Sequence, residues 1–346
     1  MKILIIGPSW VGDMVMSQTL YTSLKQQHPH ATIDVIAPAW CKPLLERMPE
    51  INQALEMPIG HGEFNLTGRY QIGKSLRGHG YTHAYVLPNS AKSALIPLFA
   101  KIPSRTGWKG ESRYGLLNDL RSNKKQFGLM VECYCALAYD KARMADSSCL
   151  PAIPHPKLNV DQAQQAASMA RLGLSDERPV LGMCPGAEFG PAKRWPEHYF
   201  AEVANAMIKA GFQVWLFGSQ KDQAVTNDIV SQLAPEHRQH CANLAGQTQL
   251  VEAIDLLAKC RIVLSNDSGL MHIAAAVGTK IVALYGSTSP DYTPPLAEQV
   301  AILHTDIECR PCFKRECPYG HLKCLKELMP SRVVDAIHKL NVEAQA

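Results

Sequence analysis

The segment that most constrains the fold covers residues 261–288, near the end of the chain. Two short apolar runs, 261–265 and 280–285, flank an apolar helical stretch of about ten residues, an order that predicts a βαβ unit. The turn before the helix contains Asn266, Asp267, Ser268 and Gly269. Free backbone N–H groups and the positive end of the helix dipole favour a phosphate there. A diphosphate is therefore the expected ligand of this turn.

The same alternation of strands and helices runs through both halves of the 346-residue chain. We predict strands at 2–6, 32–37 and 84–87 in the first half, and at 179–184 and 213–217 in the second, with a helix at 196–210. A proline-rich stretch at 147–160 lies between the halves and suits neither a helix nor a central strand. The pattern predicts α/β architecture: two Rossmann-like, doubly wound domains facing each other across a cleft, at 1–155 and 156–330, then a helix and tail at 331–346.

Charge and hydropathy exclude several classes of protein. A net charge of +4 is too small to predict wholesale binding of nucleic acid. No apolar run approaches the roughly 20 residues of a membrane-spanning helix, and residues 2–6 are interpreted as a strand rather than a signal peptide. We expect a cytoplasmic, monomeric protein whose eleven cysteines are mostly reduced.

The turn at residues 7–13 superficially resembles a dinucleotide-binding fingerprint. Ser9 replaces the second glycine, which disfavours the alternative of an NAD-dependent oxidoreductase. Asp13, at the start of the following helix, is on sequence alone more simply explained as an N-cap. The functional alternative is a carboxylate at the strand end that takes a proton from a hydroxyl group.

In the second half, the glycine-rich loop 185–196 leaves a strand and brings Lys193 close to the start of a helix. A lysine in this position can neutralise a departing diphosphate, although a solvated lysine is the simpler interpretation. His272 follows the Asp267 turn within an apolar helix, where a buried structural histidine is the commoner outcome.

The segment 101–125 is rich in basic residues, with five more positive than negative side chains, among them Arg105, Lys109 and Arg113. Such a surface suits a phosphorylated sugar or an anionic membrane. A solvated face accounts for part of the excess.

Four cysteines and one histidine lie close together near the C-terminus: Cys309, Cys312, Cys317, His321 and Cys324. Their spacing permits a structural zinc site, and buried free thiols are the alternative. A catalytic metal is not expected.

Four motifs together carry a resemblance to a known family. They are GDMV at 12–15, WKGESRYGLLN at 108–118, PGAEFGPAKRWP at 185–196 and NDSGLMH at 266–272. The chain resembles, nearly end to end, the ADP-heptose:lipopolysaccharide heptosyltransferases of glycosyltransferase family 9, and their type II members in particular. The resemblance implies a GT-B fold, with the acceptor held by the N-terminal domain and ADP-heptose by the C-terminal one.

The resemblance also implies the reaction and its residues. The enzyme would move L-glycero-D-manno-heptose, with inversion and without a metal cofactor, onto the first heptose of Kdo–lipid A–heptose at the inner face of the cytoplasmic membrane. Asp13 would be the general base, and Lys193 would stabilise the diphosphate. The implied donor residues are Gly186, Ala187, Glu188, Lys193, Gly218, Ser219, Thr248, Asp267, Ser268, Gly269 and His272. The acceptor residues expected from the resemblance and the basic segment are Ser9, Trp10, Arg105, Lys109 and Arg113.

Two alternatives stay open from the sequence. A type I or type III enzyme would use the same donor with a different acceptor. A nonenzymatic binding protein with two α/β domains would have a similar pattern of strands and helices.

Overall fold

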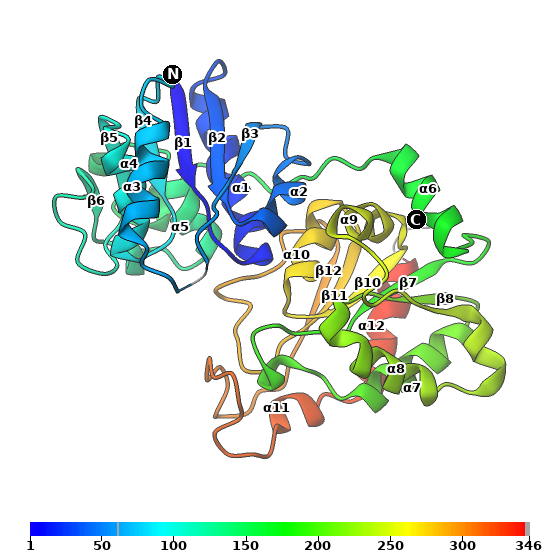
Figure 1. Ribbon diagram of the computed structural model, residues 1–346. Coiled ribbons are helices and arrows are strands. Elements are labelled where there is room, and N and C mark those ends of the chain that lie inside the picture. The colour runs from blue at the N-terminus through cyan, green and yellow to red at the C-terminus, as the bar shows by residue number, and fades with distance from the viewer. Residues whose placement is uncertain (61, 343–346) are drawn as a thin grey trace. The chain divides into compact units, whose positions relative to one another are not determined.

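The computed structural model describes residues 1–60 and 62–342, and the chain divides into two compact units, Met1–Leu158 and Asn159–Ala346 (Figure 1). The predicted boundary lay between residues 155 and 156. The end of the predicted tail, residues 343–346, lies outside the described residues.

The N-terminal unit is built on a six-stranded sheet in the order β3-β2-β1-β4-β5-β6, and its strand pairs are parallel. The strands are β1 (Lys2–Ile6), β2 (Thr32–Ala37), β3 (Ile51–Glu56), β4 (His83–Val86), β5 (Ser104–Trp108) and β6 (Asp119–Arg121). The helices are α1 (Val11–Gln27), α2 (Lys42–Leu45), α3 (Leu66–Ser75), α4 (Leu95–Phe99) and α5 (Met130–Ala136).

The central strand of this sheet is buried on both faces. Leu4 and Ile6 of β1 share a core cluster with Ile96 of α4. Ile3 and Ile5 point to the opposite face, because side chains alternate along a strand, and they are equally buried. Burial on both faces explains why β1 is a continuous apolar run, as expected for a parallel sheet covered by helices.

The C-terminal unit repeats the plan with a parallel sheet in the order β12-β11-β10-β7-β8-β9. The strands are β7 (Val180–Cys184), β8 (Gln213–Leu216), β9 (Cys241–Asn243), β10 (Ile262–Asn266), β11 (Lys280–Leu284) and β12 (Val300–Leu303). The helices are α6 (Gln162–Leu172), α7 (Glu197–Lys209), α8 (Gln223–Ser231), α9 (Leu250–Lys259), α10 (Gly269–Ala276), α11 (Lys323–Lys326) and α12 (Pro330–Val342). The final helix belongs to this unit, since Val333, Ile337 and Leu340 pack into the core that also contains Phe200 and Met207 of α7.

The strand order places the sites at which ligands bind in doubly wound sheets. Such ligands lie beyond the carboxyl ends of the strands, where the order reverses. The order reverses between β1 and β4 in the N-terminal unit and between β7 and β10 in the C-terminal unit. The turns at 7–13, 185–196 and 266–269 follow three of these strands, so the motifs singled out in the sequence occupy the expected positions. The predicted pair of doubly wound α/β folds is confirmed.

Every helix within residues 1–60 and 62–342 is too short or too polar to cross a bilayer.

Candidate functional site

Asn266, the last residue of β10, ties the loop 185–196 to the turn after β10. Its side chain is fully buried, and its amide nitrogen Nδ2 donates to the carbonyl of Pro185 at 2.7 Å. Its Oδ1 accepts the backbone N–H of Trp195 at 3.2 Å. Because Pro185 and Trp195 stand at opposite ends of the loop, one side chain fixes both ends.

Lys193 reaches from this loop to the turn after β10. It ends a short 3₁₀ helix, η6 (Pro191–Lys193), and its Nζ lies 2.5 Å from Oδ2 of Asp267. The two side chains are only 14% and 5% exposed. The hydroxyl of Thr288 donates to the same carboxylate oxygen at 2.6 Å. Two residues predicted from separate motifs are thus in direct contact. Thr288 was not predicted as a site residue. Its position shortly after β11 could have indicated it, because ligands bind beyond the carboxyl ends of such strands.

The N-terminus of α10 lies directly beside this ion pair in the chain. Ser268 is the N-cap residue, but its side chain makes no capping hydrogen bond among the described residues. Its hydroxyl instead lies 3.2 Å from that of Ser265. Gly269 begins the helix, so backbone N–H groups of the first turn and the positive dipole end are available to an anion.

A second turn, after β8, packs against the start of the loop 185–196. Asp222 accepts hydrogen bonds from the backbone N–H and the hydroxyl of Ser219, at 2.8 Å and 2.7 Å. A Cβ at Gly186 would lie 2.5 Å from Oδ1 of Asp222, and one at Gly218 would lie 2.8 Å from its Cβ. A side chain at either glycine would therefore displace Asp222, a reason for these glycines that the sequence did not reveal.

The remaining predicted donor residues lie in neighbouring turns. Ala187 is buried, whereas Glu188 forms an exposed ion pair with Lys221 at 2.8 Å. Thr248 is half-buried in the turn between β9 and α9.

His272 is 5% exposed on α10. Burial lowers its pKa to about 4, with the nearby Asp267 opposing and Lys193 reinforcing the shift. The imidazole is therefore neutral at physiological pH, which fits a structural role.

Asp13 does not cap α1, so the simpler of the two interpretations of this residue is wrong. The N-cap residue is Trp10, and Asp13 lies in the first turn of the helix. The hydroxyl of Tyr134, on α5, donates to Oδ1 of Asp13 at 3.4 Å. The carboxylate therefore lies just beyond the end of β1, and a second helix contacts it through Tyr134.

A cavity of about 360 Å³ lies at the carboxyl ends of β1, β2 and β4. Ser9 lines it together with Trp40, Asn89 and Lys92. These three residues were not predicted as site residues, because no glycine motif surrounds them in the sequence. The indole N–H of Trp40 donates to the carbonyl of Ser9 at 3.1 Å, and the residue is 55% exposed. Trp10 is 44% exposed but does not line the cavity.

The prediction that Arg113 lies on an exposed basic surface is wrong. Arg113 is buried, and its guanidinium donates to the carbonyls of Pro88 and Trp108. Burial lowers its pKa to about 10. The guanidinium of Arg105 likewise donates to the carbonyls of Leu116 and Ile102.

Of the three predicted basic residues, Lys109 is exposed, with its ammonium 5.5 Å from the ring centre of Tyr114. The charge count along the segment wrongly predicted that all three basic side chains are exposed, because backbone carbonyls can accept the hydrogen bonds of a buried guanidinium.

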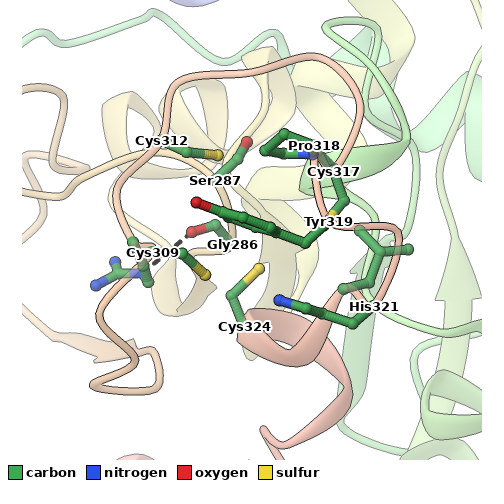
Figure 2. Close-up of a pocket in the computed structure, with 12 residues that line it drawn as sticks. Gly286, Ser287, Cys309, Cys312, Cys317, Pro318, Tyr319, His321 and Cys324 are labelled. Carbon is green, nitrogen blue, oxygen red and sulfur yellow. Dashed lines mark hydrogen bonds between the residues drawn. The ribbon is translucent and has the colours of Figure 1, made fainter.

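The cysteine cluster lines one small cavity of about 10 Å³, shown with His321 in Figure 2. Backbone N–H groups, chiefly that of Leu322, lower the pKa of Cys317. Burial and then the neighbouring thiols raise the pKa of Cys324 to about 11. Within the described ranges, no group of three or more His, Cys, Asp or Glu side chains is placed to hold a metal ion. The zinc site stays a prediction.

Comparison with known proteins decides the family. The model of glycosyltransferase family 9 (heptosyltransferase) matches residues 69–323, well over half of the chain. The chain belongs to glycosyltransferase family 9. This family 9 chain is 54% identical to lipooligosaccharide heptosyltransferase 2 of Haemophilus ducreyi, over 98% of the chain and 99% of the relative. It is 52% identical to lipopolysaccharide heptosyltransferase 2 of Salmonella typhimurium, over 98% of each.

A solved structure agrees with these relatives. The structure of E. coli ADP-heptose lps heptosyltransferase II matches the family 9 chain with a TM-score of 0.90 and 50% identity, and the match covers all of both chains. The resemblance to type II heptosyltransferases and the GT-B class of fold are confirmed. Membership of family 9 makes the chain a glycosyltransferase, which excludes the binding-protein and oxidoreductase alternatives.

Proposed function

We propose that this family 9 enzyme transfers L-glycero-D-manno-heptose from ADP-heptose to the first heptose of the lipopolysaccharide inner core. The observation that supports the donor side of this reaction is the Lys193–Asp267 ion pair, which adjoins the N-terminus of α10. Breaking the bond between the sugar and ADP places growing negative charge on the diphosphate. A lysine ammonium and a helix N-terminus are suited to stabilise that charge. The full-length match to relatives named heptosyltransferase 2 supports heptose as the group transferred.

Asp13 is the proposed general base. Its carboxylate removes the proton from the acceptor hydroxyl as that oxygen attacks the anomeric carbon. The bond from this carbon to the ADP oxygen breaks, so the configuration inverts and ADP leaves with the electron pair. The hydrogen bond from Tyr134 orients the carboxylate without adding charge.

The cavity beside Ser9 is the proposed binding site for an acceptor sugar. Its exposed Trp40 ring offers an apolar face, while Asn89 and Lys92 offer polar groups. Arg113 supports this site indirectly, because it holds the carbonyl of Pro88, which also lines the cavity. Kdo–lipid A–heptose is anchored in lipid, so we propose that the enzyme works at the inner face of the cytoplasmic membrane. We also propose that it works as a monomer.

We also propose that transfer needs no metal ion. Lys193 and the α10 N-terminus take the place that a divalent cation would occupy beside a diphosphate. Any zinc held by the cysteine cluster would be structural.

A transfer assay with defined acceptors tests the proposal. Acceptors that carry no, one or two heptoses are supplied with ADP-heptose, using the wild-type enzyme and the Asp13→Asn variant. We expect activity on the one-heptose acceptor alone, and a rate about 10² to 10⁴ times lower for Asp13→Asn with little change in ADP-heptose affinity. Activity on the bare acceptor would make the enzyme type I. A normal rate for Asp13→Asn would remove Asp13 from the mechanism.

A further inference from the structure

Phe189 lies between two cationic side chains from distant parts of the C-terminal unit. The Nζ of Lys193 lies 5.0 Å from the centre of its ring, and the Cζ of Arg315 lies 5.4 Å from the same point. Both distances are within the range of cation–π attraction. One aromatic ring thus holds two positive charges close together at the edge of the candidate donor site.

Arg315 is held in this position through its backbone. The N–H of Ala192 donates to the carbonyl of Arg315 at 3.0 Å. Gly190, with φ of 153°, lies so close that a Cβ there would come within 2.5 Å of the same carbonyl oxygen. The segment that carries Arg315 therefore packs directly on the loop that carries Lys193.

The two cations differ in their partners. Lys193 is paired with Asp267 at 2.5 Å, so that pair has almost no net charge. Arg315 is exposed, and among the described residues its guanidinium makes no hydrogen bond or ion pair. A nucleoside diphosphate carries at least two negative charges, and the α10 N-terminus supplies only about half a positive charge. With the Lys193–Asp267 pair close to neutral, the site as described so far therefore lacks more than one positive charge.

We propose that Arg315 binds the diphosphate of the nucleotide donor, together with Lys193 and the N-terminus of α10. The planar guanidinium can donate two parallel hydrogen bonds to phosphate oxygens while its face stays on the Phe189 ring. Phe189 acts as a positioning residue, because its ring contacts both cations and has no group that could donate a hydrogen bond to a phosphate. This inference rests on the proposed function, since it assigns a further residue to the same donor site.

Binding of ADP and AMP to purified variants tests the assignment by titration calorimetry. Arg315→Ala should weaken ADP binding by about tenfold, the loss expected for a charge-assisted hydrogen bond, and AMP binding by about twofold or less. Arg315→Lys should recover part of the ADP affinity, because it restores the charge without the bidentate geometry. The ADP effect should shrink as salt is raised, because Arg315 is exposed.

Lys314→Ala is the matched control, since Lys314 is the adjacent exposed cation, and the cation–π partners of Phe189 among the described residues are Lys193 and Arg315. It should bind both nucleotides as the wild type does. Phe189→Leu should reduce ADP affinity less than Arg315→Ala, because both cations remain. Unchanged ADP affinity in Arg315→Ala, or equal losses for ADP and AMP, would overturn the assignment. If the wild-type enzyme transferred no heptose but Arg315→Ala still lost ADP affinity selectively, the proposed function would fail and this inference would stand.

Discussion

The buried pair of Lys193 and Asp267 leads to a quantitative prediction about stability. Lys193→Met leaves the Asp267 carboxylate, 5% exposed, with Thr288 as its remaining identified side-chain donor. Removing one member of a buried ion pair costs about 3–5 kcal/mol. We expect about 3 kcal/mol, at the lower end of that range, because Thr288 still donates and Lys193 is partly hydrated. For a unit of this size, that loss lowers Tm by about 6–12 °C.

A double-mutant cycle separates the ion pair from simple loss of packing. Asp267→Asn should also destabilise the protein, because it leaves the Lys193 ammonium without its counter-charge. The double variant, Lys193→Met with Asp267→Asn, buries no unpaired charge, so it should lose less than the sum of the single variants. Differential scanning calorimetry measures the four proteins.

The exposed ion pair in the same unit is the control for this cycle. Lys221 and Glu188 lie 2.8 Å apart, with side chains 77% and 57% exposed. Lys221→Met should leave Tm unchanged, because solvent screens the pair. The reasoning is refuted if the effects of Lys193→Met and Asp267→Asn simply add in the double variant, or if Lys221→Met destabilises as much as Lys193→Met.

Three further predictions concern pH and metal ions. Burial lowers the pKa of His272 to about 4 from an ordinary value of 6.5, so between these values the unfolded chain binds a proton that the folded chain does not. The free energy of unfolding should therefore rise with pH across that window. Urea titrations of the His272→Gln variant should show a smaller rise. An equal dependence of unfolding free energy on pH in the variant would contradict the lowered pKa of His272. Dialysis against EDTA should leave heptose transfer unchanged, and a loss of activity that Mg²⁺ restores would contradict metal independence. Mass spectrometry of metals tests the zinc site. The site is supported if the wild-type protein holds about one zinc per chain and the variant with serine at Cys309 and Cys312 holds none. Zinc-free wild-type protein refutes it.

The fold could be predicted from the sequence where strands are fully buried. The apolar runs of β1, β7 and β10 are visible because both faces of each strand are covered by helices. The edge strands β6 and β9, with three residues each, leave no such pattern. The domain plan therefore followed from the central strands, and the edges required the structure.

The candidate site was predictable only in part, for a related reason. Lys193 and Asp267 could be singled out because each follows a buried strand in a turn rich in glycine or polar residues. The partners that decide what a side chain does come from elsewhere in the chain. Carbonyls of Pro88 and Trp108 bury Arg113, and Tyr134 holds Asp13 from another helix. Such contacts depend on tertiary packing, which local sequence patterns do not encode.

Gly190 also determines which parts of this enzyme can be exchanged between relatives. It leaves no gap between the Lys193 loop and the segment around Arg315, although more than a hundred residues of sequence separate them. A chimera that takes either segment alone from a more distant relative would set two unmatched surfaces against each other. The two segments form a single exchangeable module, and altered donor preference should be sought by replacing both at once.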